Sequence, residues 1–302
     1  MRVIRAEQLV RANGEGNASL ERHCIHTATC EIAGVVMELC TDVAEVAQLF
    51  AMRYGDHPAT RAADFRYYIA TVRGGYAFWC RHGSSWRWSQ GALPADAVLF
   101  LGDTVALAAL VRFDPHLASM HAAAVEFKGI AAAIAGAATA GKTATMLACA
   151  RRGMHVYSDE RTILRDNIVH PFLRRSSVRA AGARLLLAEN DTAGNLVDAL
   201  HTKPDLSMRT CFGGDAIAQP RPLRALFVLS GSGNCAALEA IDTAAALPSV
   251  SRWFDARGDM VDRVARAIGS LHGVKCYRLT LGSPDESAAA IAYALTRIAS
   301  AA

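Results

Sequence analysis

The sequence predicts a mixed α/β (α+β) protein of two domains, a small α+β domain over residues 1–92 and a larger domain over residues 93–302. Short alternating runs bounded by glycine fill the first part of the chain. In the second part, an apolar run leads into a glycine-rich turn and then into a helical pattern. Hydrophobic residues make up 52% of the chain and charged residues 20%, which excludes a disordered or fibrous protein.

The first elements are predicted from alternation and from spacing. Residues 25–41, IHTATCEIAGVVMELCT, alternate in polarity and are interrupted at Gly34, which predicts two strands joined by a turn. Residues 42–55 carry apolar side chains at helical spacing. Asp42 stands directly before that run, so we expect it to cap the helix N-terminus.

Aromatic residues are concentrated in the next part of the small domain. Residues 66–91 predict further strands with glycine-containing turns, and they include Trp79, Trp86 and Trp88. We expect these aromatic side chains to lie in the core and on the surface of the sheet. The alternative is that they form a peptide-binding face for substrate recognition. The glycine and proline of residues 91–94 mark the domain boundary.

The larger domain begins with a helix over residues 94–112. Residues 121–136 predict two strands around a tight turn, and residues 162–172 predict a hairpin. A buried strand is expected over residues 224–231. The last helix starts at Ser283 with a capping box, because a glutamate follows three residues later.

Charge and cysteine content narrow the class of protein. The net charge is +4, from 32 basic and 28 acidic residues, which is too balanced to indicate a nucleic-acid-binding protein. The longest apolar runs are too short to cross a bilayer, and the N-terminus lacks the apolar segment of a signal peptide. The eight cysteines form no C-x-x-C pair, which is typical of reduced, buried thiols. We therefore expect a cytoplasmic protein without membrane or nucleic-acid partners.

The stretch GAATAGKT, Gly136 to Thr143, has the spacing G-x-x-x-x-G-K-T of a phosphate-binding loop between a predicted strand and a predicted helix. Glycines let successive backbone N–H groups point at phosphate oxygens, and the helix N-terminus adds partial positive charge. Lys142 can reach the outer phosphates, and the Thr143 hydroxyl can bind Mg²⁺. The expected nucleotide-binding residues are Gly136, Ala137, Ala138, Thr139, Ala140, Gly141, Lys142, Thr143 and Ala144.

Two carboxylates follow the next strand. The helix after the loop leads directly into HVYSDE, which ends with Asp159 and Glu160. Two acids at that position can hold Mg²⁺ and take a proton from an attacking hydroxyl. The alternative is a solvated acidic turn.

The segment SMHAAAVEFKG, the loop GAATAGKT and ARRGMHVYSDE, taken in this order, resemble the catalytic segment of the HPr kinase/phosphorylase family. The segment more closely resembles the HPr-kinase-related proteins that occur with peptide and natural-product clusters. The resemblance covers roughly the last two-thirds of the chain and implies the P-loop fold shared with PEP carboxykinase. It implies that Asp159 is the catalytic base, that Glu160 is a metal or phosphate-network partner, and that His121 lies near the transferred phosphate.

The sequence also departs from the family pattern. Ala138 and Thr139 replace the usual inner Ser and Gly of the loop, and Thr139 brings a Cβ to a position that favours positive φ. Glu160 stands where the family has a second Asp. The glycine-rich signature that serves HPr binding and phosphorolysis is absent, which argues against HPr as the substrate.

The resemblance and the motifs together predict an ATP- and Mg²⁺-dependent kinase. It would transfer the γ-phosphate to a hydroxyl of a small metabolite or of a peptide serine, and the resemblance implies a precursor peptide, for example of the lasso class. Arg174 and Arg175 are candidate phosphate or substrate contacts. Two alternatives remain open, a catalytically silent nucleotide-binding regulator and a P-loop ATPase with a protein partner. Self-association into a homo-oligomer also remains open.

Overall fold

The computed structural model describes residues 21–72, 75–80, 87–90, 93–173, 176–177, 205–206, 214–255 and 260–301. The chain forms two compact units, Met1–Pro115 and His116–Ala302. Both units combine helices with strands, so the fold is α+β. None of the helices in the described ranges is long and apolar enough to cross a membrane.

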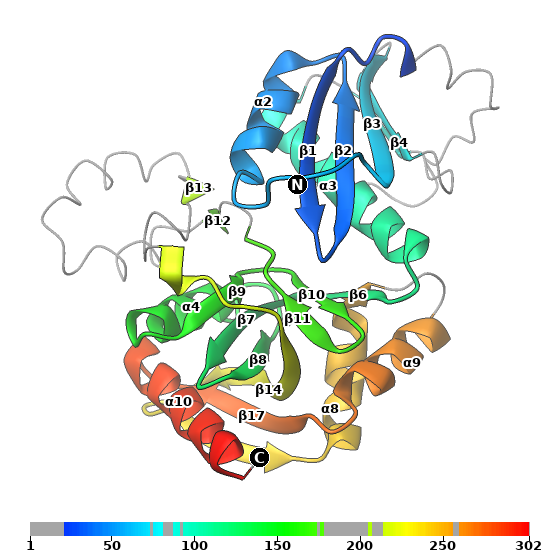
Figure 1. The fold of residues 1–302 in the computed structure, drawn as a ribbon. Helices are drawn as coiled ribbons and strands as arrows, with labels where there is room; N and C mark the ends of the chain where they lie inside the picture. Colours follow the sequence, from blue (N-terminus) through cyan, green and yellow to red (C-terminus); the bar gives the residue numbers. More distant parts are fainter. Residues whose placement is uncertain are drawn as a thin grey trace, which may run out of the picture. The chain divides into compact units, whose positions relative to one another are not determined.

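The first unit contains a five-stranded sheet in the order β1-β2-β3-β4-β5. All neighbouring strands are antiparallel except β2 and β3, which are parallel and joined through a helix. The strands and helices of this unit are β1 His26–Ile32, β2 Val35–Thr41, α2 Ala44–Arg53, β3 Phe65–Val72, β4 Gly75–Cys80, β5 Arg87–Gln90 and α3 Ala95–Phe113 (Figure 1). The predicted turn between β1 and β2 is confirmed, with φ of 49° at Ala33 and 79° at Gly34.

The start of α2 differs from the sequence prediction. Its N-cap is Val43, which makes no side-chain cap hydrogen bond, so the expected cap by Asp42 is wrong. The carboxylate of Asp42 instead accepts a hydrogen bond of 3.0 Å from the backbone N–H of Thr71 in β3. Thr41 Oγ1 accepts the N–H of Val43 at 3.1 Å. A contact distant in sequence therefore replaces the local cap.

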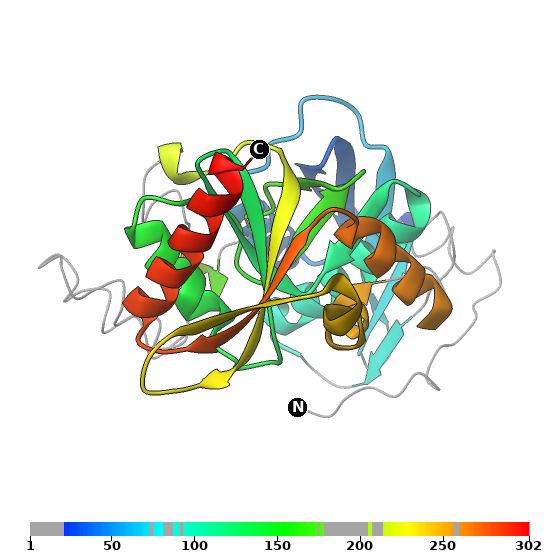
Figure 2. The same ribbon diagram turned by 90° about the horizontal axis from the view of Figure 1, so that it is seen from below.

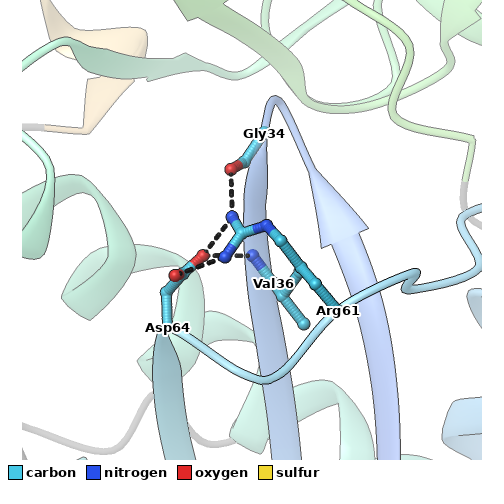
Figure 3. A network of polar contacts seen from close by, with 4 residues as sticks. All are labelled: Gly34, Val36, Arg61 and Asp64. Atoms are coloured by element: carbon cyan, nitrogen blue, oxygen red, sulfur yellow. Dashed lines mark hydrogen bonds and ion pairs between the residues drawn. The ribbon is translucent and has the colours of Figure 1, made fainter.

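A polar network connects the β1–β2 turn with the segment before β3, as Figure 3 shows. The guanidinium of Arg61 donates to the carbonyl of Gly34 at 2.7 Å and forms an ion pair with Asp64. Asp64 in turn accepts the N–H of Val36 at 2.9 Å. The hydrogen bond from Arg61 has the largest effect in lowering the pKa of Asp64, and the bond from the N–H of Val36 acts in the same direction. The network holds the parallel strands β2 and β3 together at one end.

Tyr68 and Trp79 belong to the core of this unit. Tyr68 and Trp79 stack with ring centroids 5.0 Å apart and an interplanar angle of 9°. Trp79 is only 1% exposed and packs in a buried cluster with Cys40, Ala70 and Ala77. Trp86 lies outside the described residues, as does the side chain of Trp88 in β5.

Helix α3 marks the difference between the predicted and the observed division of the chain. The sequence prediction separates the domains after residue 92, whereas the first compact unit ends at Pro115 and the second begins at His116. The reason is that α3 packs on α2, β3 and β4. Gly102 makes this packing close, because a Cβ at that position would lie 2.4 Å from Ile69 Cδ1.

The second unit contains a ten-stranded sheet with the order β16-β6-β10-β11-β14-β8-β7-β9, while β17 pairs with β14 and β15 pairs with β17. Its strands are β6 Leu117–Met120, β7 Ala122–Phe127, β8 Ile130–Ala135, β9 His155–Ser158, β10 Thr162–Arg165, β11 Ile168–His170, β14 Arg221–Ser232, β15 Ala237–Ile241, β16 Phe254–Asp255 and β17 Lys275–Leu281. The short strands β12 Ser176–Ser177 and β13 Asp205–Leu206 pair separately. Strands β8, β14 and β17 are parallel, and β7 runs antiparallel to β8 and β9.

Helices cover both faces of this sheet, as Figure 2 shows with α10 in red and α9 in orange on opposite sides of the strands. Helices α4 Lys142–Arg151 and α10 Pro284–Ser300 share one core cluster, and α8 Thr243–Val250 and α9 Met260–Leu271 share another. Alternate residues of β8 belong to the two clusters. The continuous apolar run IAAAIA is explained by this burial on both faces.

Candidate functional site

The loop between β8 and α4 has the local geometry that its sequence predicts. It runs from Gly136 to Gly141, and its middle residues Ala137, Ala138 and Thr139 are exposed. Gly141 has φ of 97°, and a Cβ there would lie 2.9 Å from Leu281 Cδ1. The positive φ favours glycine at position 141, where Leu281 Cδ1 is the mobile end of a side chain. At position 136 packing favours glycine, since a Cβ there would lie 3.0 Å from Leu229 Cβ.

Thr139 adopts the positive φ that the sequence analysis anticipates, at 69°. This backbone region is unfavourable for a β-branched residue, because its Cβ crowds the following carbonyl. The loop therefore stores strain at the residue that departs from the usual glycine. Such strain persists where the surrounding structure fixes the backbone.

Lys142 is the first residue of α4 and points back into the loop. It is 7% exposed, and its Nζ donates to the carbonyls of Gly136 at 2.9 Å and of Ala137 at 3.0 Å. Burial lowers the pKa of Lys142, while the negative charge of Glu160 acts in the opposite direction. An ammonium group has three donors, and the two bonds within the loop leave the third for a phosphate oxygen.

The N-terminus of α4 is chemically suited to an anion. Its N-cap, Gly141, supplies no side-chain hydrogen bond, and the first turn contains no acidic residue. The early N–H groups of a helix lack intrahelical partners and carry partial positive charge. Thr143 and Ala144 lie in this first turn and are half-buried. The hydroxyl of Thr143 is thus a candidate Mg²⁺ ligand beside the loop.

Strand pairing brings three separate segments to the same edge of the sheet. Ala122, the first residue of β7, pairs with Ala135, the last residue of β8, so His121 lies beside the start of the loop. On its other side β7 pairs with β9, with Ala124 opposite Ser158. Met120 in β6 pairs with Thr162 in β10.

These last two pairings keep the same offset along the chain. Continuing the β6–β10 register by one residue places Arg161 at the level of His121. Continuing it by two residues, toward the pair Ala124 and Ser158, places Glu160 at the level of Ala122. Thr162 Oγ1 strengthens this junction by donating to the carbonyl of Ala122 at 3.0 Å. The negative charge of Glu160 acts on Lys142 across this edge of the sheet.

His121 is half-buried among charged groups. The backbone N–H of His121 donates to the carbonyl of Trp253 at 2.8 Å. Burial, above all, lowers the pKa of His121, and the positive charges of Lys142 and Arg161 act in the same direction. Glu160 and Asp255 oppose them. These surroundings favour the neutral imidazole, which has one N–H donor and one acceptor nitrogen.

Arg161 and Asp255 were not identified from the sequence. The guanidinium Nη1 of Arg161 forms an ion pair with Asp255 Oδ2, with side chains 20% and 32% exposed. Arg161 could have been noticed because it directly follows Asp159 and Glu160. Asp255 gave no such signal, because it is 94 residues away in sequence and reaches the site through the pairing of β16 with β6.

The structure therefore gathers most of the predicted site residues at one sheet edge: the loop with Lys142 and Thr143, His121, Asp159 and Glu160. Glu160 is the carboxylate whose charge affects both Lys142 and His121. Arg174 and Arg175 lie outside the described residues. No group of three or more His, Cys, Asp or Glu side chains in the described ranges is arranged to hold a metal ion.

No family model matches the chain, and no curated protein matches it. Among solved structures, the chain is similar to the HPr(Ser) kinase/phosphatase from Coxiella burnetii, at 12% identity. The match covers 60% of this chain and 88% of the other, with a TM-score of 0.30. A likeness at this TM-score does not identify a family.

Proposed function

We propose that the protein is an ATP- and Mg²⁺-dependent kinase that phosphorylates a hydroxyl group of a peptide serine or of a small metabolite. The observation that carries the proposal is the meeting of Lys142 and its loop, His121 and the Asp159–Glu160 turn at one sheet edge. A kinase needs a phosphate cradle, a metal-binding acid and a proton acceptor within reach of one another.

The loop amides, the N-terminus of α4 and Lys142 would hold the phosphates of ATP. Residues 137–139 are exposed, and Gly136 and Gly141 stand where a Cβ would be unfavourable, which fits this role. Thr143, Asp159 and Glu160 supply the oxygen ligands that Mg²⁺ prefers. Bound Mg²⁺ would neutralise negative charge on the phosphates during transfer.

We propose different roles for the two acids. Glu160 acts electrostatically on Lys142 and His121, which suits a metal-side acid that balances charge. Asp159 would accept the proton of the acceptor hydroxyl. The oxygen of that hydroxyl forms the new bond to the γ-phosphorus. The bond between that phosphorus and the bridging oxygen breaks, and ADP leaves with the electron pair. Neutral His121 can donate a hydrogen bond to the transferred group.

The test measures transfer from γ-labelled ATP with Mg²⁺ to a panel of serine-containing peptides and small alcohols, for wild type and Asp159→Asn. Loss of a general base lowers the rate by about 100- to 10,000-fold, while ATP binding should persist. The control is Asp166→Asn, at an exposed hairpin turn where φ is 48° and asparagine is readily accommodated. The control should keep full transfer activity.

Other results would identify the alternatives. Release of labelled phosphate to water without labelled acceptor, stimulated by a protein partner, would indicate an ATPase. Tight ATP binding without any turnover would indicate a nucleotide-binding regulator, for which the strained loop at Thr139 gives a structural reason. Equal turnover by wild type and Asp159→Asn would contradict the assignment of the base.

A further inference from the structure

The Arg161–Asp255 ion pair spans strand β6 beside the proposed phosphate site. Asp255 in β16 pairs with Ser119 on one side of β6, and Arg161 lies at the level of His121 on the other side. Directly opposite residues of antiparallel strands project on the same face, so Ser119 lies on the face that carries Asp255. The ion pair therefore crosses β6 next to His121.

Two features describe the surroundings of this ion pair. The β6–β10 register places Arg161 at the level of His121, and the positive charges of Arg161 and Lys142 both act on this imidazole. Ser119 is fully buried, and within the described part of the chain its hydroxyl has no hydrogen-bond partner. A buried hydroxyl without a partner is costly, and a bound water can complete such a group below the surface that carries Arg161.

The geometry of Arg161 suits a phosphoryl group. Its hydrogen bond to Asp255 uses Nη1, and a guanidinium has five N–H donors in a planar fork. Among the described residues, the remaining donors leave a face for paired bonds to phosphate oxygens. Asp255 fixes the rotation of this fork, as a carboxylate does for a phosphate-binding cation in protein kinases.

We infer that Arg161 contacts the γ-phosphoryl group of ATP and that Asp255 is a positioning residue for its guanidinium. This inference rests on the proposed function, because it assigns a second cation to the same nucleotide site. Lys142 would hold the phosphates from the loop side, and Arg161 would neutralise charge on the transferred group from the β10 side. The alternative is a purely structural ion pair that connects β16 with the residue before β10.

Binding of two probes separates these alternatives. Calorimetry with Mg²⁺ would give the affinity for ADP and for the imido-bridged, non-hydrolysable ATP analogue, which differ by the terminal group. Arg161→Gln should weaken binding of the ATP analogue by about tenfold to a hundredfold and that of ADP by less than about threefold. Arg161→Lys should recover part of the loss, because it keeps the charge without the fork.

Asp255→Asn provides a second variant if Arg161→Gln folds poorly. It should show the same selective loss for the ATP analogue at a smaller size, because the guanidinium is still present but less well oriented. The matched control is Arg278→Gln, which removes an exposed ion pair of 2.6 Å with Glu239 between β17 and β15. The control should change neither affinity.

The outcomes are distinct. Equal weakening of both nucleotides, or no weakening, in both Arg161→Gln and Asp255→Asn would overturn the inference and leave a structural ion pair, with the proposed kinase function intact. If wild type binds neither nucleotide, the proposed function and the inference fail together. A selective loss in both variants, absent from Arg278→Gln, would establish the γ-phosphoryl contact.

Discussion

Thr139 and Gly141 lie two residues apart in the loop, and both adopt positive φ, of 69° and 97° respectively. The glycine does so without steric cost, whereas the threonine carries a β-branched side chain into a region that disfavours it. The middle of the loop and its end at α4 thus differ in strain, although both have a positive φ.

Replacing Thr139 with glycine should stabilise the protein. The left-handed conformation costs an L-residue about 1–2 kcal/mol, and the added freedom of glycine in the unfolded chain returns roughly 0.4–1 kcal/mol of that gain. We expect Thr139→Gly to raise the free energy of unfolding by about 0.5–1 kcal/mol in urea denaturation. Thr139→Ala, which keeps the Cβ, should gain less. A Thr139→Gly protein no more stable than wild type would show that the loop is not strained there.

The imidazole of His121 should make stability depend on pH. Its pKa in the folded protein lies below the ordinary value of 6.5, because of burial and the charges of Lys142 and Arg161, against Glu160 and Asp255. Below 6.5 the unfolded chain therefore binds more protons here than the folded protein, and stability falls as the pH falls. Denaturation at about pH 7.5 and 5.5 should show a smaller loss for His121→Gln than for wild type. Equal losses would contradict the assigned burial of the imidazole.

The capping box of α10 should contribute measurably to stability. Ser283 Oγ accepts the N–H of Glu286 at 3.2 Å, and Glu286 Oε2 accepts the N–H of Ser283 at 2.8 Å. We expect Ser283→Ala to lower the free energy of unfolding by about 1 kcal/mol. Ser300→Ala is the matched control on the same helix, because Ser300 Oγ donates to the Thr296 carbonyl at 3.0 Å near the C-terminus. If both variants lose the same amount, the cap is not the cause.

Features that depend on neighbouring residues were predicted well from the sequence. The cap at Ser283 and the turn at Lys128 and Gly129 are confirmed, because each depends on local backbone chemistry. The strand, loop and helix around Gly136 follow in the predicted order, while phosphate binding by the loop stays a prediction. The cap at Asp42 was wrong because Thr71, distant in sequence, binds its carboxylate. A sequence pattern cannot reveal such a competing partner.

The composition of the candidate site was only partly predictable. Lys142, His121 and Glu160 belong to motifs or adjoin them, and strand register brings them together. Asp255 comes from a two-residue strand, and its place beside Arg161 follows only from the pairing of β16 with β6. Contacts between distant segments of this kind depend on topology, which local periodicity does not specify.

The shared offset on the two sides of residues 159–161 also constrains how this protein can vary. β9 pairs with β7 and β10 pairs with β6, so insertion or deletion of one residue between them would shift one pairing relative to the other. A shift of one residue turns every side chain of a strand to the opposite face. An insertion or deletion in the segment that carries Asp159, Glu160 and Arg161 would therefore change which of these side chains lies at the level of His121, whereas a substitution would not.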